Sequence, residues 1–277
     1  MPRAAMAKGA WLACLGVVLV TGCATFGVQP VRRPGEFTIA RGQLLFHSDF
    51  PLPANHRLLE ELTARRVDLE ERLDLPGSDE PIHVYLFENA ADFKEFVHAR
   101  HPEFPPRRAF FLETDTRLQV YAQWGDRVAE DLRHEVTHGY LHSVISDVPL
   151  WLDEGVAEYS EAPRGHRGLN RDHLRYLGEQ MREGLWQPDL TRLERIGPSR
   201  DLTQAEYAES WAWVHFLFES SPERAAVLRD YFAALRQKGT AEPISARLAR
   251  LDADPGQALL AYVAALASPS SPQPGNL

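Results

Sequence analysis

Residues 134–159, HEVTHGYLHSVISDVPLWLDEGVAEY, combine three histidines and several carboxylates with the apolar spacing of amphipathic helices. His134 and His138 are four positions apart, which on a helix places both imidazoles on one face, one turn apart. Their nitrogens can then converge on a Zn²⁺ ion at about 2.0–2.1 Å each. Glu135 follows the first histidine, so its carboxylate projects beside the metal and can take a proton from a bound water. This spacing predicts a zinc site with Glu135 as the catalytic base.

A third zinc ligand is needed, and two residues compete for the role. His142 continues the row of histidines, but at about 1.5 Å per residue it lies about 12 Å along the helix from His134, too far to share one metal ion. We therefore expect His142 to be a surface or packing residue. Between His138 and Glu154 the chain has enough residues to end one helix, turn at SDVP and return on a second helix. Glu154 is the predicted third ligand.

The stretch PLWLDEGVAEY, residues 149–159, resembles the W-L-x-E-G-x-A pattern of gluzincin metallopeptidases of the aminopeptidase N-like and peptidase MA-like families. The resemblance implies a zincin-like fold and peptide-bond hydrolysis, with Glu135 as the base. It also implies that Gly155 is the small residue at which helices pack closely. The ligands that match the family are His134, His138 and Glu154. Residues 105–122 lack the G-x-M-E-N exopeptidase motif, which favours an endopeptidase.

Three further residues receive predicted roles around the site. Glu158 lies one helical turn after Glu154, so we expect its carboxylate to accept a hydrogen bond from one of the ligating histidines, whereas Asp153 should be a surface residue. The resemblance also implies that a Tyr or His from the helical half stabilises the oxyanion. Tyr207 is the first candidate for that role. His215 is the second candidate, although a helix as apolar as YAESWAWVHFLF also suits a purely structural histidine.

The N-terminus has the features of a bacterial lipoprotein signal. Residues 1–22 contain a short basic region and an apolar run too short to span a bilayer. The run ends at Val20-Thr21-Gly22-Cys23, which resembles a lipobox, so Cys23 is the predicted lipidation site; a plain secretory signal is the alternative. Cys14 lies in the segment to be removed, which would leave no thiol for a disulfide. We expect a protein of the bacterial cell envelope, anchored in a membrane by lipid, with the outer membrane facing the periplasm favoured.

The rest of the chain predicts an α+β fold. The pattern indicates a tether at 23–36, a mixed α/β sheet subdomain at 37–125, a helical catalytic subdomain at 126–267 and a disordered tail at 268–277. A formal net charge of −9 argues against nucleic acid as a partner, because phosphate binding requires a basic face.

Together these observations predict a zinc-dependent peptidase whose partners are a peptide or protein substrate and a membrane. The Zn²⁺ would polarise the carbonyl while Glu135 transfers a proton from water to the leaving amine. One alternative is an amidase that acts on cell-wall peptides. The other is a lipoprotein that keeps the zinc fold for binding or assembly, but an intact Glu135 argues against it.

Overall fold

The computed structural model describes residues 32–268. The predicted signal peptide, Cys23, most of the tether and residues 269–277 of the predicted tail therefore lie outside the described residues. No helix among residues 32–268 is both long enough and apolar enough to cross a membrane.

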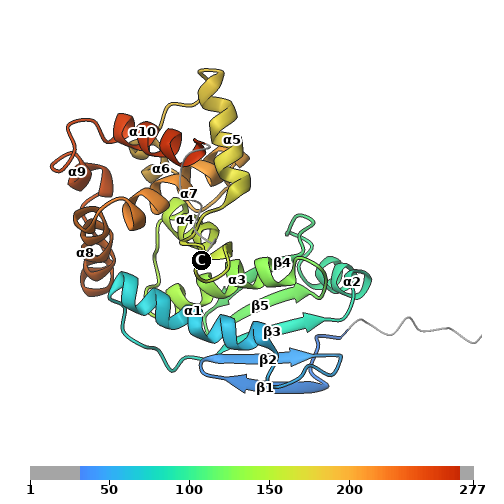
Figure 1. Ribbon diagram of the computed structural model, residues 1–277. Coiled ribbons are helices and arrows are strands. Elements are labelled where there is room, and N and C mark those ends of the chain that lie inside the picture. The colour runs from blue at the N-terminus through green and yellow to red at the C-terminus, as the bar shows by residue number, and fades with distance from the viewer. Residues whose placement is uncertain (1–31, 269–277) are drawn as a thin grey trace, which may run out of the picture. The chain divides into compact units, whose positions relative to one another are not determined.

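The N-terminal half forms one five-stranded mixed sheet in the order β1-β2-β3-β5-β4 (Figure 1). The β2–β3 and β3–β5 pairs are parallel, while β1 and β4 are antiparallel edge strands. A tight turn at Asp115 and Thr116 joins β4 to β5. The strands are β1 (Phe37–Arg41), β2 (Leu44–Ser48), β3 (Ile82–Phe87), β4 (Ala109–Thr114) and β5 (Arg117–Gln123).

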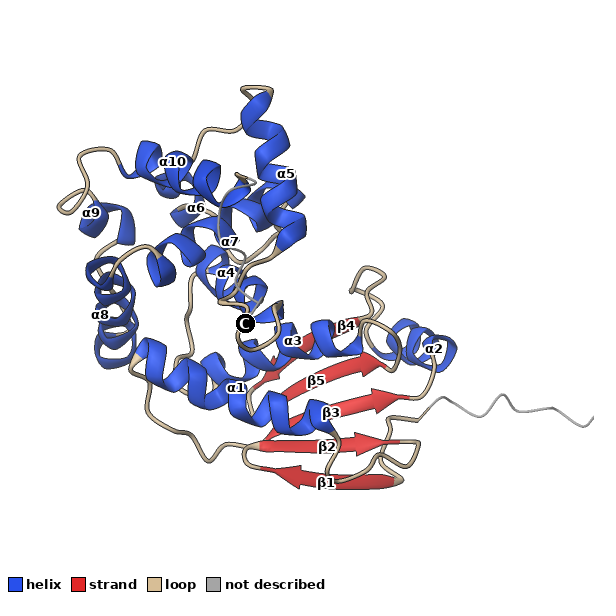
Figure 2. Cartoon of the chain, in the orientation of Figure 1, coloured by secondary structure: helices blue, strands red, loops and turns tan. Residues whose placement is uncertain are grey.

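Two helices lie along one face of this sheet, and a third packs near one end of the other face (Figure 2). Alternate residues of β3 explain the arrangement: Val84 faces the main core with α1 (Arg57–Leu73) and α3 (Val128–His142), whereas Phe87 faces a second aromatic cluster with α2 (Ala90–Arg100). The α3 helix lies close enough to β3 that a Cβ at Gly139 would come within 3.0 Å of the Ile82 side chain. The sheet therefore fixes the position of α3.

Between β5 and residue 268 every element is a helix, which confirms the predicted α+β class with a mixed sheet followed by a helical half. Local signals set several helix starts. Asn89 caps α2, and Ser221 and Asp254 cap helices whose first residue is proline. These later helices are α4 (Leu150–Glu161), α5 (Arg171–Arg182), α6 (Leu190–Glu194), α7 (Gln204–Glu219), α8 (Pro222–Lys238), α9 (Ile244–Leu248) and α10 (Pro255–Ala267).

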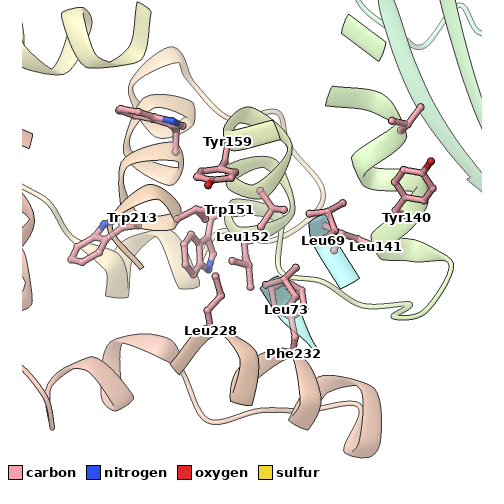
Figure 3. Close-up of a cluster of buried hydrophobic side chains, with 14 of the residues drawn as sticks. Leu69, Leu73, Tyr140, Leu141, Trp151, Leu152, Tyr159, Trp213, Leu228 and Phe232 are labelled. Carbon is pink, nitrogen blue, oxygen red and sulfur yellow. The ribbon is translucent and has the colours of Figure 1, made fainter. Parts of the chain in front are cut away.

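Helix α4 is the centre of the molecule because it packs on both halves. Figure 3 shows its Trp151, Leu152 and Tyr159 among side chains of α1, α3, α7 and α8. Against α7, a Cβ at Gly155 would come within 2.7 Å of the Ser210 carbonyl oxygen, so a larger residue would push the helices apart. The implied close packing at Gly155 is therefore present, and it holds α4 rigidly between α3 and α7.

Candidate metal centre

The predicted ligands come together where α3 packs against α4. Nε2 of His134 lies 3.4 Å from Oε2 of Glu154, and Nε2 of His138 lies 3.8 Å from the same oxygen. The two imidazole rings are 4.9 Å apart between centroids, one helical turn apart as their spacing requires. Three potential ligand atoms thus converge, although the end of α3, a loop and the start of α4 separate His138 from Glu154 in the chain.

The donor set fits a tetrahedral divalent metal ion. Ligand atoms bound at about 2.0–2.2 Å to one tetrahedral zinc are separated from each other by roughly 3.4 Å. In addition, Glu154 Oε2 is buried and makes no hydrogen bond within residues 32–268. Its nearest polar neighbours are the two imidazole nitrogens, at distances longer than an ordinary hydrogen bond, and a cation between the three atoms would satisfy all of them.

The electrostatics of these residues also favour a cation. Burial alone lowers the pKa of His134, but the carboxylates of Glu154 and Glu161 together raise it well above its ordinary value. Burial raises the pKa of Glu154, whereas His134 and His138 lower it, and the net direction is downward. The carboxylates therefore stay ionised and attract positive charge, which either protonated imidazoles or a bound metal ion would supply.

Two carboxylates contact the Nδ1 atoms of the imidazoles, the ring nitrogens that do not approach Glu154 Oε2. Nδ1 of His134 lies 3.0 Å from Oε1 of Glu161, and Nδ1 of His138 lies 2.9 Å from Oδ2 of Asp153. The contact of His134 is a hydrogen bond, whereas that of His138 is a close ion-pair contact without hydrogen-bond geometry. Carboxylates in these positions fix the tautomer of a histidine that binds a metal through Nε2. Sequence reasoning missed both carboxylates in this role. The available signal for Glu161 was its spacing, since it lies two helical turns after Glu154 on the same face of α4.

The expectation that Asp153 lies at the surface is wrong. Its side chain is only 14% exposed, and Oδ2 also lies 3.2 Å from Nε2 of His142. The other nitrogen of His142 lies 2.6 Å from the Glu113 carboxylate on β4. His142 therefore does not join His134 and His138 as a third ligand; it connects the edge strand to Asp153.

Glu158 lies beside the site but contacts a different histidine. Its Oε2 is 2.7 Å from Nε2 of His173 on α5 and 3.4 Å from the Asn170 amide nitrogen. Carboxylate oxygens of Glu158 and Glu161 do lie within 4.8 Å of a His134 nitrogen. The hydrogen-bonding contact with His134, however, comes from Glu161, because Glu158 is drawn towards α5. The contact that the sequence predicted for Glu158 is thus made to His134 by Glu161.

A pocket of about 290 Å³ opens onto the converging ligand atoms. Glu135 lines this pocket, and burial raises the pKa of its carboxyl group despite the opposing effect of the two histidines. A raised pKa brings a carboxylate closer to the value that suits a general base. The β4 residue Phe111 completes the wall with its ring 5.9 Å from that of His138. The edge strand thus borders the candidate site directly.

Tyr207 and His215 have different surroundings despite sharing α7. Tyr207 lines the pocket, and its hydroxyl donates a long hydrogen bond of 3.5 Å to Oε1 of Glu154. Burial and the Glu154 carboxylate raise the pKa of Tyr207, so the phenol stays protonated and can donate. His215 is 4% exposed and lies 2.8 Å from the hydroxyl of Tyr262, among Tyr159 and Trp211. Of the two oxyanion candidates, only Tyr207 reaches the pocket.

Arg107 is a pocket residue that sequence reasoning missed. It precedes β4, and its guanidinium lies 2.9 Å from Asp201 in the loop before α7. The pair therefore joins the sheet half to the helical half beside the pocket. No local pattern could identify it, since the two residues are far apart in the chain.

Residues 128–244 match the model of a family described as a protein of unknown function, DUF1570. The matched segment begins at the first residue of α3 and includes the three converging residues, Glu135 and Tyr207. No curated protein matches the chain. The family description names no activity.

Proposed function

We propose that the protein is a zinc-dependent peptidase, most consistent with an endopeptidase of the gluzincin type. The observation that carries the proposal is the approach of two imidazole Nε2 atoms to one buried carboxylate oxygen, Oε2 of Glu154, which makes no hydrogen bond among residues 32–268. Two neutral imidazoles and one carboxylate form the ligand set of several catalytic zinc sites, which keep a fourth position for water or substrate.

The edge strand β4 supports a peptide as the substrate. Among the described strands it pairs with β5 alone, and its residues Phe111 and Glu113 line the pocket. An extended peptide can add to such an edge through main-chain hydrogen bonds, with its side chains pointing alternately towards and away from the site. This arrangement would place an internal peptide bond beside His134 and His138. It favours cleavage within a chain over removal of a terminal residue.

Each residue of the pocket has a separate task in this proposal. When bound, Zn²⁺ would act as a Lewis acid on the scissile carbonyl and make a water molecule nucleophilic near neutral pH. Glu135 accepts the proton from the attacking water and passes it to the nitrogen of the leaving amine. Tyr207 donates a hydrogen bond to the oxygen that becomes negative as the carbonyl is attacked. Asp153 and Glu161 keep the histidines in the tautomer that presents Nε2.

We also propose that the chain acts at a bacterial membrane surface. The support is the sequence Val20-Thr21-Gly22-Cys23 after a short apolar run. This pattern would direct the attachment of acyl chains to Cys23, and these chains would anchor the protein. The tether at 23–36 would then separate the catalytic unit from the membrane.

The direct test is to measure metal content and hydrolysis of an unfolded protein by the purified chain and by Glu135→Gln. We expect about one zinc per chain in both proteins and proteolysis only by the wild type, lost on chelation and restored by zinc. A wild-type protein that binds zinc but cuts neither unfolded protein nor cell-wall peptides would overturn the enzymatic proposal.

A further inference from the structure

A second pocket, of about 190 Å³, lies near the end of α4 that is remote from Glu154. Its walls come from α1, from the C-terminal turn of α4 and from the loop that follows α4. It shares no lining residue with the candidate metal centre. The proposed peptidase activity assigns it no role.

Four arginines line this pocket: Arg65, Arg72, Arg164 and Arg167. Two carboxylates pair with three of them. Asp68 accepts two hydrogen bonds of 2.7 Å from Arg164, while Glu219 pairs with Arg72 at 2.8 Å and with Arg167 at 2.6 Å. The arginines therefore outnumber their paired carboxylates, and the pocket has an excess of positive charge in a chain whose formal net charge is −9.

Arg65 is the arginine without an ionic partner. It is only 6% exposed, and within the described residues no carboxylate oxygen lies within 4.0 Å of its guanidinium. Its Nη2 donates to the Ala162 carbonyl oxygen at 2.8 Å, while Nε is buried without any hydrogen-bond partner. Burial lowers the pKa of Arg65, as expected for a charge that has lost its hydration. The carboxylates of Asp68 and Glu61 offset part of this effect, but they pair directly with Arg164 and Arg133. A bound anion would add the compensation that Arg65 lacks.

The hydroxyl of Ser160, in the C-terminal turn of α4, is a second polar group without a hydrogen-bond partner among residues 32–268. The residue is fully buried, lines the same pocket, and its Oγ makes no hydrogen bond in the described part of the chain. A hydroxyl can donate to an oxyanion as readily as a guanidinium can. Two polar atoms without hydrogen-bond partners among residues 32–268, Arg65 Nε and Ser160 Oγ, thus belong to residues that line one positively charged pocket, and since both atoms are closed to water, an anion would reach them only after their side chains shift.

The loop after α4 is folded tightly over this pocket. Arg167 has a φ of 51°, which non-glycine residues seldom adopt, and Gly168 follows with a φ of 70°. A Cβ at Gly168 would lie 2.0 Å from the ring of Tyr159, so the close approach requires glycine. This backbone holds Arg167 beside Arg72 and against Glu219. Unfavourable backbone conformations of this kind are retained where the surrounding structure demands them.

We propose that this pocket binds a small tetrahedral oxyanion, of the class of phosphate or sulfate. Guanidinium groups from α1 and from the loop after α4 surround one confined space, which suits an anion that accepts hydrogen bonds in several directions. A planar carboxylate, by contrast, is satisfied by one arginine in a fork-to-fork pair. The pocket volume and the burial of Arg65 favour a free ion over a large charged surface.

Calorimetric titration of the purified protein with sodium phosphate, at constant ionic strength and with a metal chelator present, tests this site. The chelator prevents phosphate from binding through a metal ion. We expect saturable binding, a melting temperature that rises with phosphate, similar behaviour with sulfate, and weaker binding of acetate and chloride. Arg65→Gln and Arg167→Gln should each weaken phosphate binding at least tenfold, or about 1.4 kcal/mol.

Arg250→Gln is the matched control, because Arg250 is exposed and pairs with Glu242 outside the pocket. It should bind phosphate like the wild type. Since Arg65 also supports the end of α4, Arg65→Gln is expected to melt at a lower temperature even without phosphate. The decisive quantity is therefore the affinity, and Arg167→Gln repeats the test at a more exposed residue. Equal phosphate affinity in wild type and both pocket variants, or the same response to chloride as to phosphate, would overturn the proposal.

Discussion

The hydroxyl of Tyr207 lies 3.5 Å from Oε1 of Glu154, although the two residues belong to different helices, α7 and α4. The contact depends on the close packing of these helices at Gly155, where Ser210 of α7 leaves no room for a side chain. It places a phenolic donor beside the candidate ligands while the other carboxylate oxygen, Oε2, faces His134 and His138. Tyr207 is therefore in position to act on a substrate oxygen at the same centre.

Tyr207→Phe should lower kcat at least tenfold, or about 1.4 kcal/mol of barrier, with little change in KM. The reason is that a hydrogen bond to the developing oxyanion exists mainly in the transition state, and loss of such a donor typically costs about 10²–10³ in rate. Steady-state kinetics and a melting curve measure the two effects. An unchanged kcat with a loss of stability of about 0.5–1.5 kcal/mol would make Tyr207 a structural residue.

Metal binding should depend on Glu154 and not on His142. Glu154→Ala removes the oxygen that both imidazoles approach, so it should release most of the zinc. Removal of the metal from the wild type by a chelator should lower the melting temperature. His142→Ala should keep the metal, because His142 contacts Asp153 and Glu113 and does not reach the converging atoms. Elemental analysis of the purified variants measures this. Zinc lost from His142→Ala but kept by Glu154→Ala would refute the ligand assignment.

Glu135→Gln should keep both the zinc and the fold but abolish hydrolysis. The amide has nearly the same shape as the carboxylate, but it cannot accept the proton of the attacking water. Zinc content, the melting curve and proteolysis of an unfolded substrate should be measured on one preparation. Turnover retained by this variant would assign the base to another residue.

The local parts of this structure could be predicted from the sequence. Asn89, Ser221 and Asp254 each cap a helix through hydrogen bonds to amides two or three residues away, so the signal and the structure lie in the same segment. The pairing of His134 with His138 is equally local, since one helical turn determines it. The alternation along β3 likewise follows from the strand itself.

The surroundings of the site could not be predicted in the same way. The neighbours of Asp153 in sequence suit a surface residue. In the structure, the packing of α4 against α3 places its carboxylate between His138 and His142. Glu158 had suitable spacing, but it is His173, from α5, that draws its carboxylate away. These outcomes depend on how helices cross, which side-chain volumes across the whole core determine.

Cys23→Ala should prevent acylation, because the sulfur that would receive lipid is absent. Cys23 lies outside the described residues, so this prediction rests on the sequence alone. The variant should accumulate as precursor or be cut at another site. Labelling with radioactive palmitate measures the modification directly. Label incorporated into Cys23→Ala at the wild-type level would count against the predicted lipid anchor.

The carboxylate that orients His134 can be identified by comparing Glu161→Gln with Glu158→Gln. Glu161 Oε1 lies 3.0 Å from Nδ1 of His134, whereas Glu158 Oε2 lies 2.7 Å from His173. An amide in place of Glu161 removes the negative charge that raises the pKa of His134 and makes its nitrogen a better ligand. Loss of such a partner typically weakens metal affinity about 10–100-fold.

We therefore expect Glu161→Gln to bind zinc at least tenfold more weakly in a competition titration with a chelator. Glu158→Gln should change this affinity much less, because its direct partner is not a ligand. Weaker zinc binding by Glu158→Gln than by Glu161→Gln would support Glu158 in the role predicted from the sequence. The carboxylates of Glu158 and Glu161 would then be arranged differently when the metal is bound.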